Sequence, residues 1–463
     1  MAPLVLGIDS STQSTKALLV DAETGQVLEE RRATHPDGTE VDPRTWLDAV
    51  DEAAGPLLER ADALAVGGQQ HGMVLLDAEG EVVRDALLWN DTRSAPQAQA
   101  LIEEMGGAQA SVEEIGSLMV ASFTASKLRW VRDTEPGSAE RAARVMLPHD
   151  YVSLHLAEPG TAAFTDRGDA SGTGYYSTRE EAWKPELVEA AIGHGLELPR
   201  LPESPNEVMA RTAGGAAIAA GTGDNMGAAL GLSLGPGDVS VSIGTSGVCA
   251  MVSETRPGDA TGTVTGFADA TGRFLPMTTT LNASRILEAG RALLGVDHEE
   301  MAELALASEP GAHGVTLLPY FDGERTPNRP DARATLTGMS TSTTREDVAR
   351  AYVEGLLCSL ADGIAALEER TGTAPRRITL IGGGARSRAV QQLAPAIFGR
   401  EVTIAPDGEY VALGAARQAA WALAGTDEPP AWEISGSQVV DAEPTPQVLE
   451  AYRELKERTE GWG

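Results

Sequence analysis

Two similar segments that lie far apart in the chain constrain its fold most. Residues 4–20 contain an apolar strand, a polar turn rich in Ser and Thr at residues 9–15, and a second apolar strand. Residues 239–252 repeat this order around a Gly-Thr-Ser-Gly turn at residues 244–247. Alternation of apolar and polar side chains predicts half-buried strands, so both segments predict β-hairpins. The repetition is typical of a duplicated chain, although two unrelated hairpins would look the same.

The length of the chain also favours two domains. A chain of 463 residues is too long for one ordinary hydrophobic core. A Gly/Pro-containing segment at residues 234–237 precedes the second hairpin, and we expect the domain boundary there. The predicted domains are residues 1–233 and residues 234–463.

Strands and helices alternate in the second half, which predicts an α/β fold. Thr343 and Glu346 have the spacing of a capping box, and apolar residues then recur at helical spacing as far as residue 367. Residues 378–381 form a predicted strand, followed by three glycines and a helix that begins near Ser387. Such a glycine turn often presents backbone N–H groups to a nucleotide. The last thirty or so residues predict a peripheral tail that ends in a helix.

Composition excludes several classes of partner. The formal net charge is −32, from 68 acidic and 36 basic residues, which argues against nucleic acid or an anionic membrane as a partner. No apolar run reaches the ~18 residues of a membrane span. The two cysteines lie in apolar stretches, which predicts buried thiols. No signal peptide is evident at the N-terminus, and a cytoplasmic enzyme fits these features.

The first turn suits a metal–phosphate complex. Asp9 could hold Mg²⁺, while Thr12, Gln13 and Ser14 offer hydroxyl, amide and backbone donors to phosphate oxygens. Lys16 could add a positive charge. An ordinary Asp-Ser turn would show the same residues. The second turn, with Gly244 and Thr245, could approach phosphates from another side, or simply close a hairpin.

Two further segments offer polar groups for a substrate. Asp224 begins a predicted helix, where it could cap the helix or accept a proton from a hydroxyl, and a pKa near ~3.9 would keep it ionised at neutral pH. Gln70 and His71, between glycines, carry donors and acceptors that can read sugar hydroxyls, although such a histidine is often structural. Trp89 could form an aromatic wall or belong to the core.

Familiar kinase and hydrolase signatures are absent from the sequence. It has no GxxxxGK[ST] loop, no His-Arg-Asp catalytic loop and no nucleophile elbow. No His/Cys cluster has the spacing of a zinc site.

Taken in order, the segments resemble the FGGY carbohydrate kinases along nearly the whole chain, with elements similar to the xylulokinase branch. The resemblance rests on residues 7–16, 70–72, 88–91, 150–151, 165–166, 169–173, 223–225, 242–246, 319–327, 382–387 and 412–416. The sequence departs from the family pattern at Gln70, where Met is usual, at His149, where Lys is common, and at Pro395. We expect the change at Gln70 to bear on the sugar, and the other two to concern structure.

The resemblance implies two actin-like (ribonuclease-H-like) domains with a deep cleft between them. It implies ATP and Mg²⁺ as cofactors, phosphorylation of D-xylulose at its 5-hydroxyl, and a homodimer. Asp224 would be the general base and Asp9 the metal-supporting carboxylate. The implied contacts are Gln70, His71, Trp89, Asp224 and Asn225 for the sugar, and Thr12, Gln13, Ser14, Lys16, Gly244, Thr245, Gly383, Gly384 and Ser387 for the nucleotide.

Two alternative functions stay open at this point. One is an FGGY kinase for another ketose, such as ribulose, or for a polyol. The other is a non-catalytic actin-like ATP-binding protein, which would need no sugar site and so would not explain the Gly-Asp-Asn and Gln-His-Gly segments.

Overall fold

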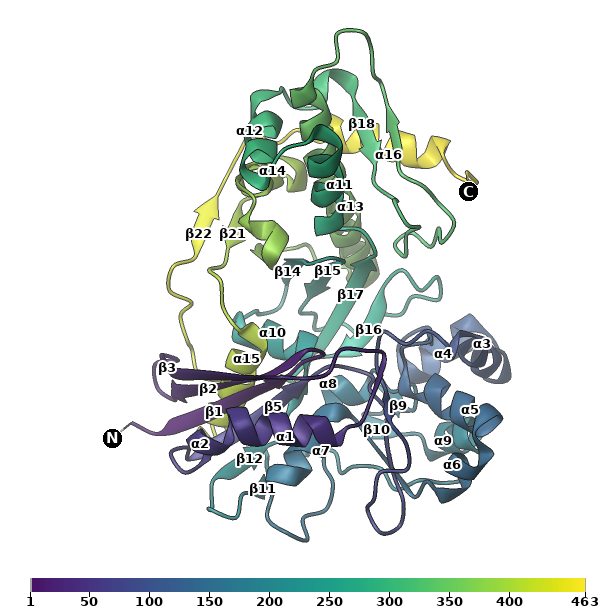
Figure 1. The fold of residues 1–463 in the computed structure, drawn as a ribbon, viewed down its shortest axis with the longest axis vertical. Coiled ribbons are helices and arrows are strands. Elements are labelled where there is room, and N and C mark those ends of the chain that lie inside the picture. Colours follow the sequence, from purple (N-terminus) through teal and green to yellow (C-terminus); the bar gives the residue numbers. More distant parts are fainter. Residues whose placement is uncertain (1, 463) are drawn as a thin grey trace. The chain divides into compact units, whose positions relative to one another are not determined.

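The computed structural model describes residues 2–462, which form two compact units. Unit 1 comprises Met1–Leu234, Glu254–Leu275 and Gly408–Glu433, and unit 2 comprises Gly235–Ser253, Pro276–Asp407 and Ile434–Gly463. The colours of Figure 1 show that segments from distant parts of the sequence contribute to each unit.

Unit 1 is built around a mixed sheet with the strand order β11-β12-β5-β1-β2-β3, and β13 also pairs with β5. The strands of unit 1, inside and outside this sheet, are β1 (Leu4–Ser10), β2 (Ser14–Asp21), β3 (Val27–Thr34), β4 (Glu40–Val41), β5 (Ala63–Gly68), β6 (Val74–Leu76), β7 (Ala86–Leu87), β8 (Arg144–Met146), β9 (Tyr176–Ser177), β10 (Ala182–Trp183), β11 (Val208–Arg211), β12 (Ala217–Ala219), β13 (Thr222–Gly223) and β16 (Thr265–Ala268). Its helices are α1 (Arg44–Ala53), α2 (Gly55–Leu58), α3 (Ala95–Glu104), α4 (Ala108–Ile115), α5 (Thr124–Thr134), α6 (Pro136–Arg141), α7 (Pro148–Leu156), α8 (Arg167–Ala170), α9 (Pro185–Ile192), α10 (Asp224–Gly231) and α15 (Tyr410–Ala424).

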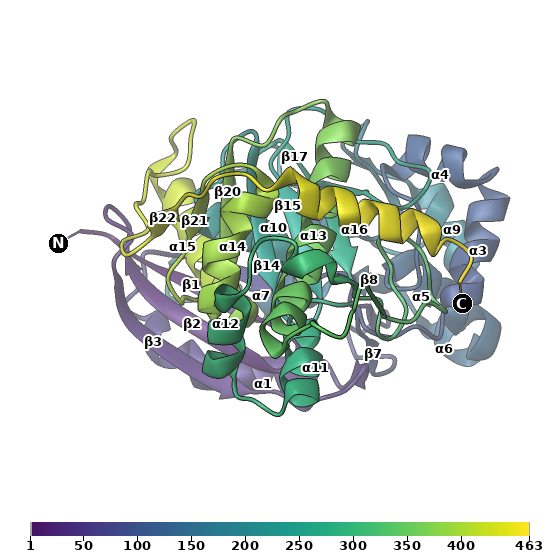
Figure 2. The ribbon, with the colours of Figure 1, turned by 90° about the horizontal axis from the view of Figure 1, so that it is seen from above.

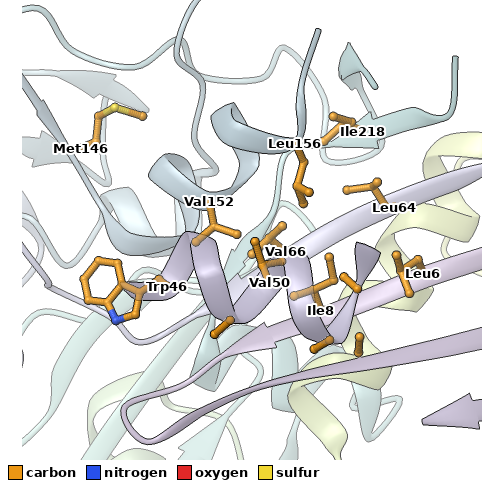
Figure 3. Packing of buried hydrophobic residues seen from close by; sticks show 14 of the residues in the cluster. Leu6, Ile8, Trp46, Val50, Leu64, Val66, Met146, Val152, Leu156 and Ile218 are labelled. Atoms are coloured by element: carbon orange, nitrogen blue, oxygen red, sulfur yellow. The ribbon is translucent and has the colours of Figure 1, made fainter. Parts of the chain in front are cut away.

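Alternating side chains of this sheet enter two separate hydrophobic layers. On one face, Leu6 and Ile8 of β1 pack with Trp46 and Val50 of α1 and with Val152 of α7, as Figure 3 shows. The opposite face, which includes Val5 of β1, packs against an alanine-rich stripe of α15. A period of two along β1 therefore places helices on both faces of the sheet.

Unit 2 contains a second sheet and its own helices. Its strands are β14 (Asp238–Ile243), β15 (Gly247–Met251), β17 (Phe274–Thr280, mostly in this unit), β18 (Thr316–Leu318), β19 (Thr335–Thr337), β20 (Arg377–Ile381), β21 (Val402–Ile404) and β22 (Gln438–Val440). Its helices are α11 (Ser284–Leu294), α12 (His298–Ala307), α13 (Arg345–Thr371), α14 (Arg388–Phe398) and α16 (Pro446–Arg458), with short 3₁₀ turns at Ala312–Gly314 and Gly383–Arg386.

The sheets of the two units repeat one topology. The order β3-β2-β1-β5-β12-β11 in unit 1 corresponds to β17-β15-β14-β20-β21-β22 in unit 2. In both sheets the first two pairings are antiparallel, the next two are parallel and the last is antiparallel. The two predicted hairpins occupy equivalent places, β1–β2 and β14–β15, which confirms that the fold is repeated.

The capping box of α13 lies one residue later than predicted. Thr344, not Thr343, is the N-cap, and it exchanges hydrogen bonds with Asp347, not Glu346. Both spacings fit the rule. Asp347 is favoured because its carboxylate also accepts hydrogen bonds from Ser308 Oγ at 2.6 Å and from His313 Nδ1 at 2.7 Å.

The helix predicted near the end of the chain is present as α16, and it packs on other helices of unit 2. Val448, Tyr452 and Leu455 of α16 are buried, and Figure 2 shows α16, in yellow, lying across α13 and α14. Helix α14 continues through Pro395 to Phe398.

Two other predictions from composition are confirmed. Cys249 and Cys358 are both buried, free thiols. Within residues 2–462, no helix has both the length and the apolar character that a membrane span requires.

Glycines allow α15 to approach its neighbours closely. A Cβ atom on Gly414 of α15 would lie 1.9 Å from the carbonyl oxygen of Gly227 in α10, and one on Gly7 of β1 would lie 1.9 Å from that of Ala412. Real Cβ atoms do not approach backbone oxygens so closely, so these contacts require glycine.

We therefore expect Gly414→Ala to lower the free energy of unfolding by roughly 1–3 kcal/mol through overpacking. Gly137→Ala is the matched control, because Gly137 is exposed in α6 and a Cβ there meets nothing within 4 Å. It should leave stability unchanged or raise it by about 0.4–1 kcal/mol. Urea unfolding followed by circular dichroism measures both, and equal effects would contradict the close packing of α15.

Candidate active site

Three strand ends bring polar residues to one edge of the unit 1 sheet. Strands β1 and β13 both run parallel to β5, and Asp9 and Thr222 are each in register with Gly67. Asp224 follows β13 directly, and Gln70 lies two residues beyond the end of β5. In open α/β sheets, ligands bind outside the carboxyl ends of the strands.

Asp224, Asn225 and Gln70 form a continuous hydrogen-bonded chain. The backbone N and the Nδ2 of Asn225 donate to Asp224 Oδ1 at 2.7 and 2.8 Å, and Nδ2 also donates to Gln70 Oε1 at 2.8 Å. The Nε2 of Gln70 is buried and has no hydrogen-bond partner among residues 2–462. Gln70 thus holds Asn225, a contact that a methionine thioether would make only weakly.

The pKa of Asp224 departs from the ordinary value expected from the sequence. Burial, and after it the negative charge of Asp9, raise it from 3.8 to about 7, against the two hydrogen bonds from Asn225, which act to lower it. The expectation of a normal carboxylate pKa was therefore wrong, because sequence does not reveal desolvation. A base whose pKa lies near neutrality suits proton abstraction at physiological pH.

Asp9 shares its surroundings with a cation and a further acid. Lys16 Nζ lies 3.4 Å from Asp9 Oδ2 and 2.6 Å from Oε2 of Glu409, which precedes α15. Burial raises the pKa of Asp9 to about 6, although Lys16 acts to lower it. Glu409 was not identified from the sequence, since it lies 393 positions from Lys16.

The residues around Asp9 fit a magnesium ion bound together with phosphates. Asp9 Oδ1 is buried and accepts no hydrogen bond from the described residues. No group of three or more His, Cys, Asp or Glu side chains in residues 2–462 could hold a metal ion by itself. Mg²⁺ is commonly bound by one or two carboxylates plus substrate phosphates, so a single carboxylate meets that requirement.

The first turn is shorter than expected and carries an aromatic neighbour. Only residues 11–13 separate β1 from β2, so Ser14 is a buried strand residue, whereas Thr12 is half-buried and Gln13 exposed. Trp89 is 48% exposed, which excludes it from the core, and its Nε1 donates to Thr12 Oγ1 at 3.0 Å.

His71 is held in an unusual backbone conformation. Its φ is +67°, in the left-handed region. Its ring Nδ1 donates to the carbonyl oxygen of Gly172 at 2.8 Å, and the ring stacks on Phe123 with centroids 5.1 Å apart. With the proton on Nδ1, Nε2 of a neutral ring is an acceptor.

A buried lysine fixes the His71 backbone. Lys127 of α5 is fully buried and donates to the carbonyl oxygens of His71 at 2.7 Å and of Ser122 at 2.6 Å. Burial lowers the pKa of Lys127 to about 7. A neutral amine keeps two N–H donors, which match these two acceptors. An isolated lysine on an amphipathic helix gave no signal in the sequence.

Unit 2 contains a pocket at the equivalent strand ends. The pocket has a volume of about 700 Å³, within the usual range for small ligands. Its lining includes Gly244 and Thr245 after β14, and Gly383, Gly384 and Ser387 after β20. A Cβ on Gly384 would lie 2.3 Å from Ile243 Cγ2, so this turn also requires glycine.

The structure thus assembles the predicted residues as two groups. Unit 1 holds the predicted sugar residues with Asp9, Thr12, Gln13, Ser14 and Lys16, while the pocket of unit 2 holds the other five predicted nucleotide residues. Sequence reasoning missed Lys127 and Glu409 in unit 1, and Ser284, Leu287, Glu288, His298, Glu299, Ala302 and Arg388 in the pocket, whereas Arg386 of the pocket lies in the segment 382–387 that carried the resemblance.

Comparison with known proteins agrees with this arrangement. Residues 4–231 match the N-terminal domain of the FGGY family of carbohydrate kinases, and residues 239–423 match its C-terminal domain. A xylulose kinase of Streptomyces coelicolor is 46% identical over 458 residues, covering 95% of this chain and 93% of that protein.

Solved structures share the fold. The crystal structure of a xylulose kinase from Bifidobacterium adolescentis has a TM-score of 0.93 and 48% identity, covering 98% of this chain and 99% of that one. A gluconate kinase from Lactobacillus acidophilus shares the fold with a TM-score of 0.86 at 22% identity, covering 99% and 98%. The two-domain α/β chain therefore belongs to the FGGY family of carbohydrate kinases.

Proposed function

We propose that this carbohydrate kinase transfers a phosphoryl group from ATP to the 5-hydroxyl of D-xylulose, giving D-xylulose 5-phosphate. The observation that carries the proposal is Asp224, a half-buried carboxylate with a pKa of about 7, held by Asn225 and electrostatically coupled to Asp9. Such a carboxylate is suited to accept the proton of an attacking hydroxyl.

The sugar would lie against the polar edge of unit 1. Gln70 and Asn225 offer amide groups, His71 offers a ring acceptor, and Trp89 offers an exposed aromatic face. Polar groups with several donors and acceptors, beside an aromatic surface, are what a polyhydroxylated substrate requires.

The nucleotide would use backbone donors and few cations. In unit 2 the glycine turn before α14 and the turn at Gly244 and Thr245 line a pocket of suitable size. In unit 1 we propose that Thr12, Gln13 and Lys16 contact phosphate oxygens, whereas Ser14 is buried in β2. Asp9 would hold Mg²⁺, which neutralises charge on the transferring phosphoryl group when it is bound.

In the proposed reaction, Asp224 Oδ accepts the proton as the sugar oxygen attacks the γ-phosphorus, and the bond from that phosphorus to the bridging oxygen breaks, so ADP leaves. Lys16 balances negative charge near Asp9, and turn N–H groups stabilise the equatorial oxygens. Asn225 fixes the orientation of the base through its two hydrogen bonds to Oδ1. Positioning of this kind supplies most of the rate enhancement in phosphoryl transfer.

The choice of D-xylulose rests on the relatives rather than on the fold. The Streptomyces coelicolor and Bifidobacterium adolescentis proteins, 46% and 48% identical to this chain, are both named xylulose kinases. The gluconate kinase with the same fold illustrates that the fold alone does not select the sugar. We further propose that the enzyme acts in the cytoplasm, where ATP is supplied, and forms a homodimer as the family resemblance implies.

A panel of sugars tests the substrate directly. We expect ADP release with MgATP to depend on added sugar, and kcat/KM to be highest with D-xylulose among xylulose, ribulose, other ketoses and polyols. A higher kcat/KM for ribulose or a polyol would support a different sugar kinase. ATP binding with no sugar-dependent ADP release would support a non-catalytic ATP-binding protein and contradict the proposal.

Removal of the base should stop transfer without removing the nucleotide. We expect Asp224→Asn to lower kcat by about 10²–10⁴-fold, while MgATP binding, measured by calorimetry, stays measurable. Asp427→Asn is a matched control, since Asp427 is exposed in the same unit, and its turnover should equal that of the wild type. Near-normal turnover in Asp224→Asn would refute the assignment of the base.

The pH profile should report the raised pKa of Asp224. A general base acts in its ionised form, so kcat/KM should fall about tenfold per pH unit once the pH drops below about 7. Asp9, with a pKa of about 6, should steepen the fall at lower pH. Direct quantification of ADP avoids the pH dependence of coupling enzymes. A profile that stays flat down to pH ~5 would contradict the raised pKa of the base.

A further inference from the structure

A histidine in unit 1 that the mechanism does not use is surrounded by carboxylates. His149 is the second residue of α7 and is completely buried. Its Nε2 lies 3.2 Å from an oxygen of Asp150 and 3.4 Å from an oxygen of each of Asp166 and Asp169. All three carboxylates are themselves buried, at 3% exposure or less. Such a group of buried acids must be balanced by a cation or by protonation.

The His149 side chain also packs against the two backbone segments that carry the proposed sugar and base residues. A Cβ on Gly68, two residues before Gln70, would lie 2.9 Å from His149 Cβ. A Cβ on Gly221, three residues before Asp224, would lie 2.6 Å from His149 Nδ1. The ring therefore fills the space between the end of β5 and the turn that leads into α10.

The carboxylates connect His149 to a third segment of the site. Asp166 caps the short helix α8 by accepting hydrogen bonds from the backbone N of Gly168 at 2.8 Å and of Asp169 at 2.9 Å. This turn ends at Gly172, whose carbonyl oxygen accepts the hydrogen bond from His71 Nδ1. One imidazole thus faces all three segments that hold Gln70, His71 and Asp224.

The charges around the ring indicate a protonated imidazole. Burial alone would lower the pKa of His149, but the three carboxylates outweigh burial and raise it to about 9. One cation cannot balance three carboxylates, and burial raises the pKa of Asp150 to about 6 and that of Asp169 well above its usual range. Asp224 is among the negative groups that raise the pKa of Asp169, so the cluster lies within electrostatic reach of the proposed base.

We propose that His149, as a buried cation, is a positioning residue that holds the segments bearing Gln70, His71 and Asp224 in the geometry required for sugar phosphorylation. This inference rests on the proposed function. His149 touches no reacting atom; it acts through the carboxylates and glycines that surround it. Misplacement of catalytic groups by about 1 Å can cost roughly 10²-fold in rate, so loss of the cation should be visible in turnover.

The first test compares a neutral with a charged replacement. We expect His149→Gln to lower kcat about 10²-fold and to raise KM for the sugar, with KM for ATP unchanged. His149→Lys keeps a cation and should restore most of the lost rate. The control is His155→Gln on the same helix, because His155 is exposed to solvent on one side and pairs with Asp51; its kinetics should match the wild type.

These outcomes separate the inference from the proposed function. Sugar-dependent ADP release by the wild type is established first, and its absence would remove the proposed function itself. Wild-type kcat in His149→Gln would overturn the positioning role. His149→Lys as impaired as His149→Gln would overturn the role of charge.

A double variant keeps the test valid if His149→Gln does not fold. His149→Gln combined with Asp150→Asn removes the cation together with the carboxylate nearest to it, which lies 3.2 Å from Nε2 and has a pKa of about 6, so the buried cluster stays closer to balance. We expect the double variant to fold and to turn over faster than His149→Gln alone. A double variant that is no more active or soluble than the single variant would overturn the proposal.

Discussion

The close contact between β1 and helix α15 determines where the polar edge of unit 1 lies. The position of Gly7 has no room for a Cβ, because the carbonyl oxygen of Ala412 lies too close. An alanine stripe on α15 packs against Val5 of β1. Small residues on both elements allow this separation, as in other tightly packed helix–sheet layers. Because α15 begins just after Glu409, the contact also places that carboxylate 2.6 Å from Lys16. A change in this packing would therefore shift the charge balance around Asp9.

Burying carboxylates at this edge costs free energy, mainly because the ionised groups lose their contact with water. Moving the pKa of Asp224 from 3.8 to about 7 corresponds to on the order of 4 kcal/mol of disfavoured ionisation, at 1.36 kcal/mol per pKa unit. Asn225 offsets part of this by donating twice to Oδ1. If Asp224 is the base that we propose, this loss of folding stability accompanies its reactivity, as is common at functional sites.

Sequence predicted the fold well because its signals were local. Alternation in the two hairpins and the glycine turn after residue 381 depend on neighbours in the chain, and the structure contains all of them. The capping box lies one residue later than predicted because Ser308 and His313, which are distant in the sequence, donate hydrogen bonds to Asp347. The sequence analysis missed Lys127 and Glu409, and the pKa that it expected for Asp224 was wrong. Burial, and contacts between residues that lie hundreds of positions apart, leave no local pattern in the sequence.

The two sheets share one topology, but the residues at their strand ends differ in chemical character. In unit 1 the strand ends carry carboxylates, amides and a histidine, and burial raises the pKa of Asp9 to about 6 and, together with the negative charge of Asp9, that of Asp224 to about 7. In unit 2 the equivalent ends carry glycines and hydroxyls, beside Arg386 and Arg388. With a net charge of −32, long-range attraction cannot bring a polyanion to either edge. In the proposed nucleotide site, local N–H donors and a few cations would do so instead, and the glycine turns at the strand ends of unit 2 can supply such donors.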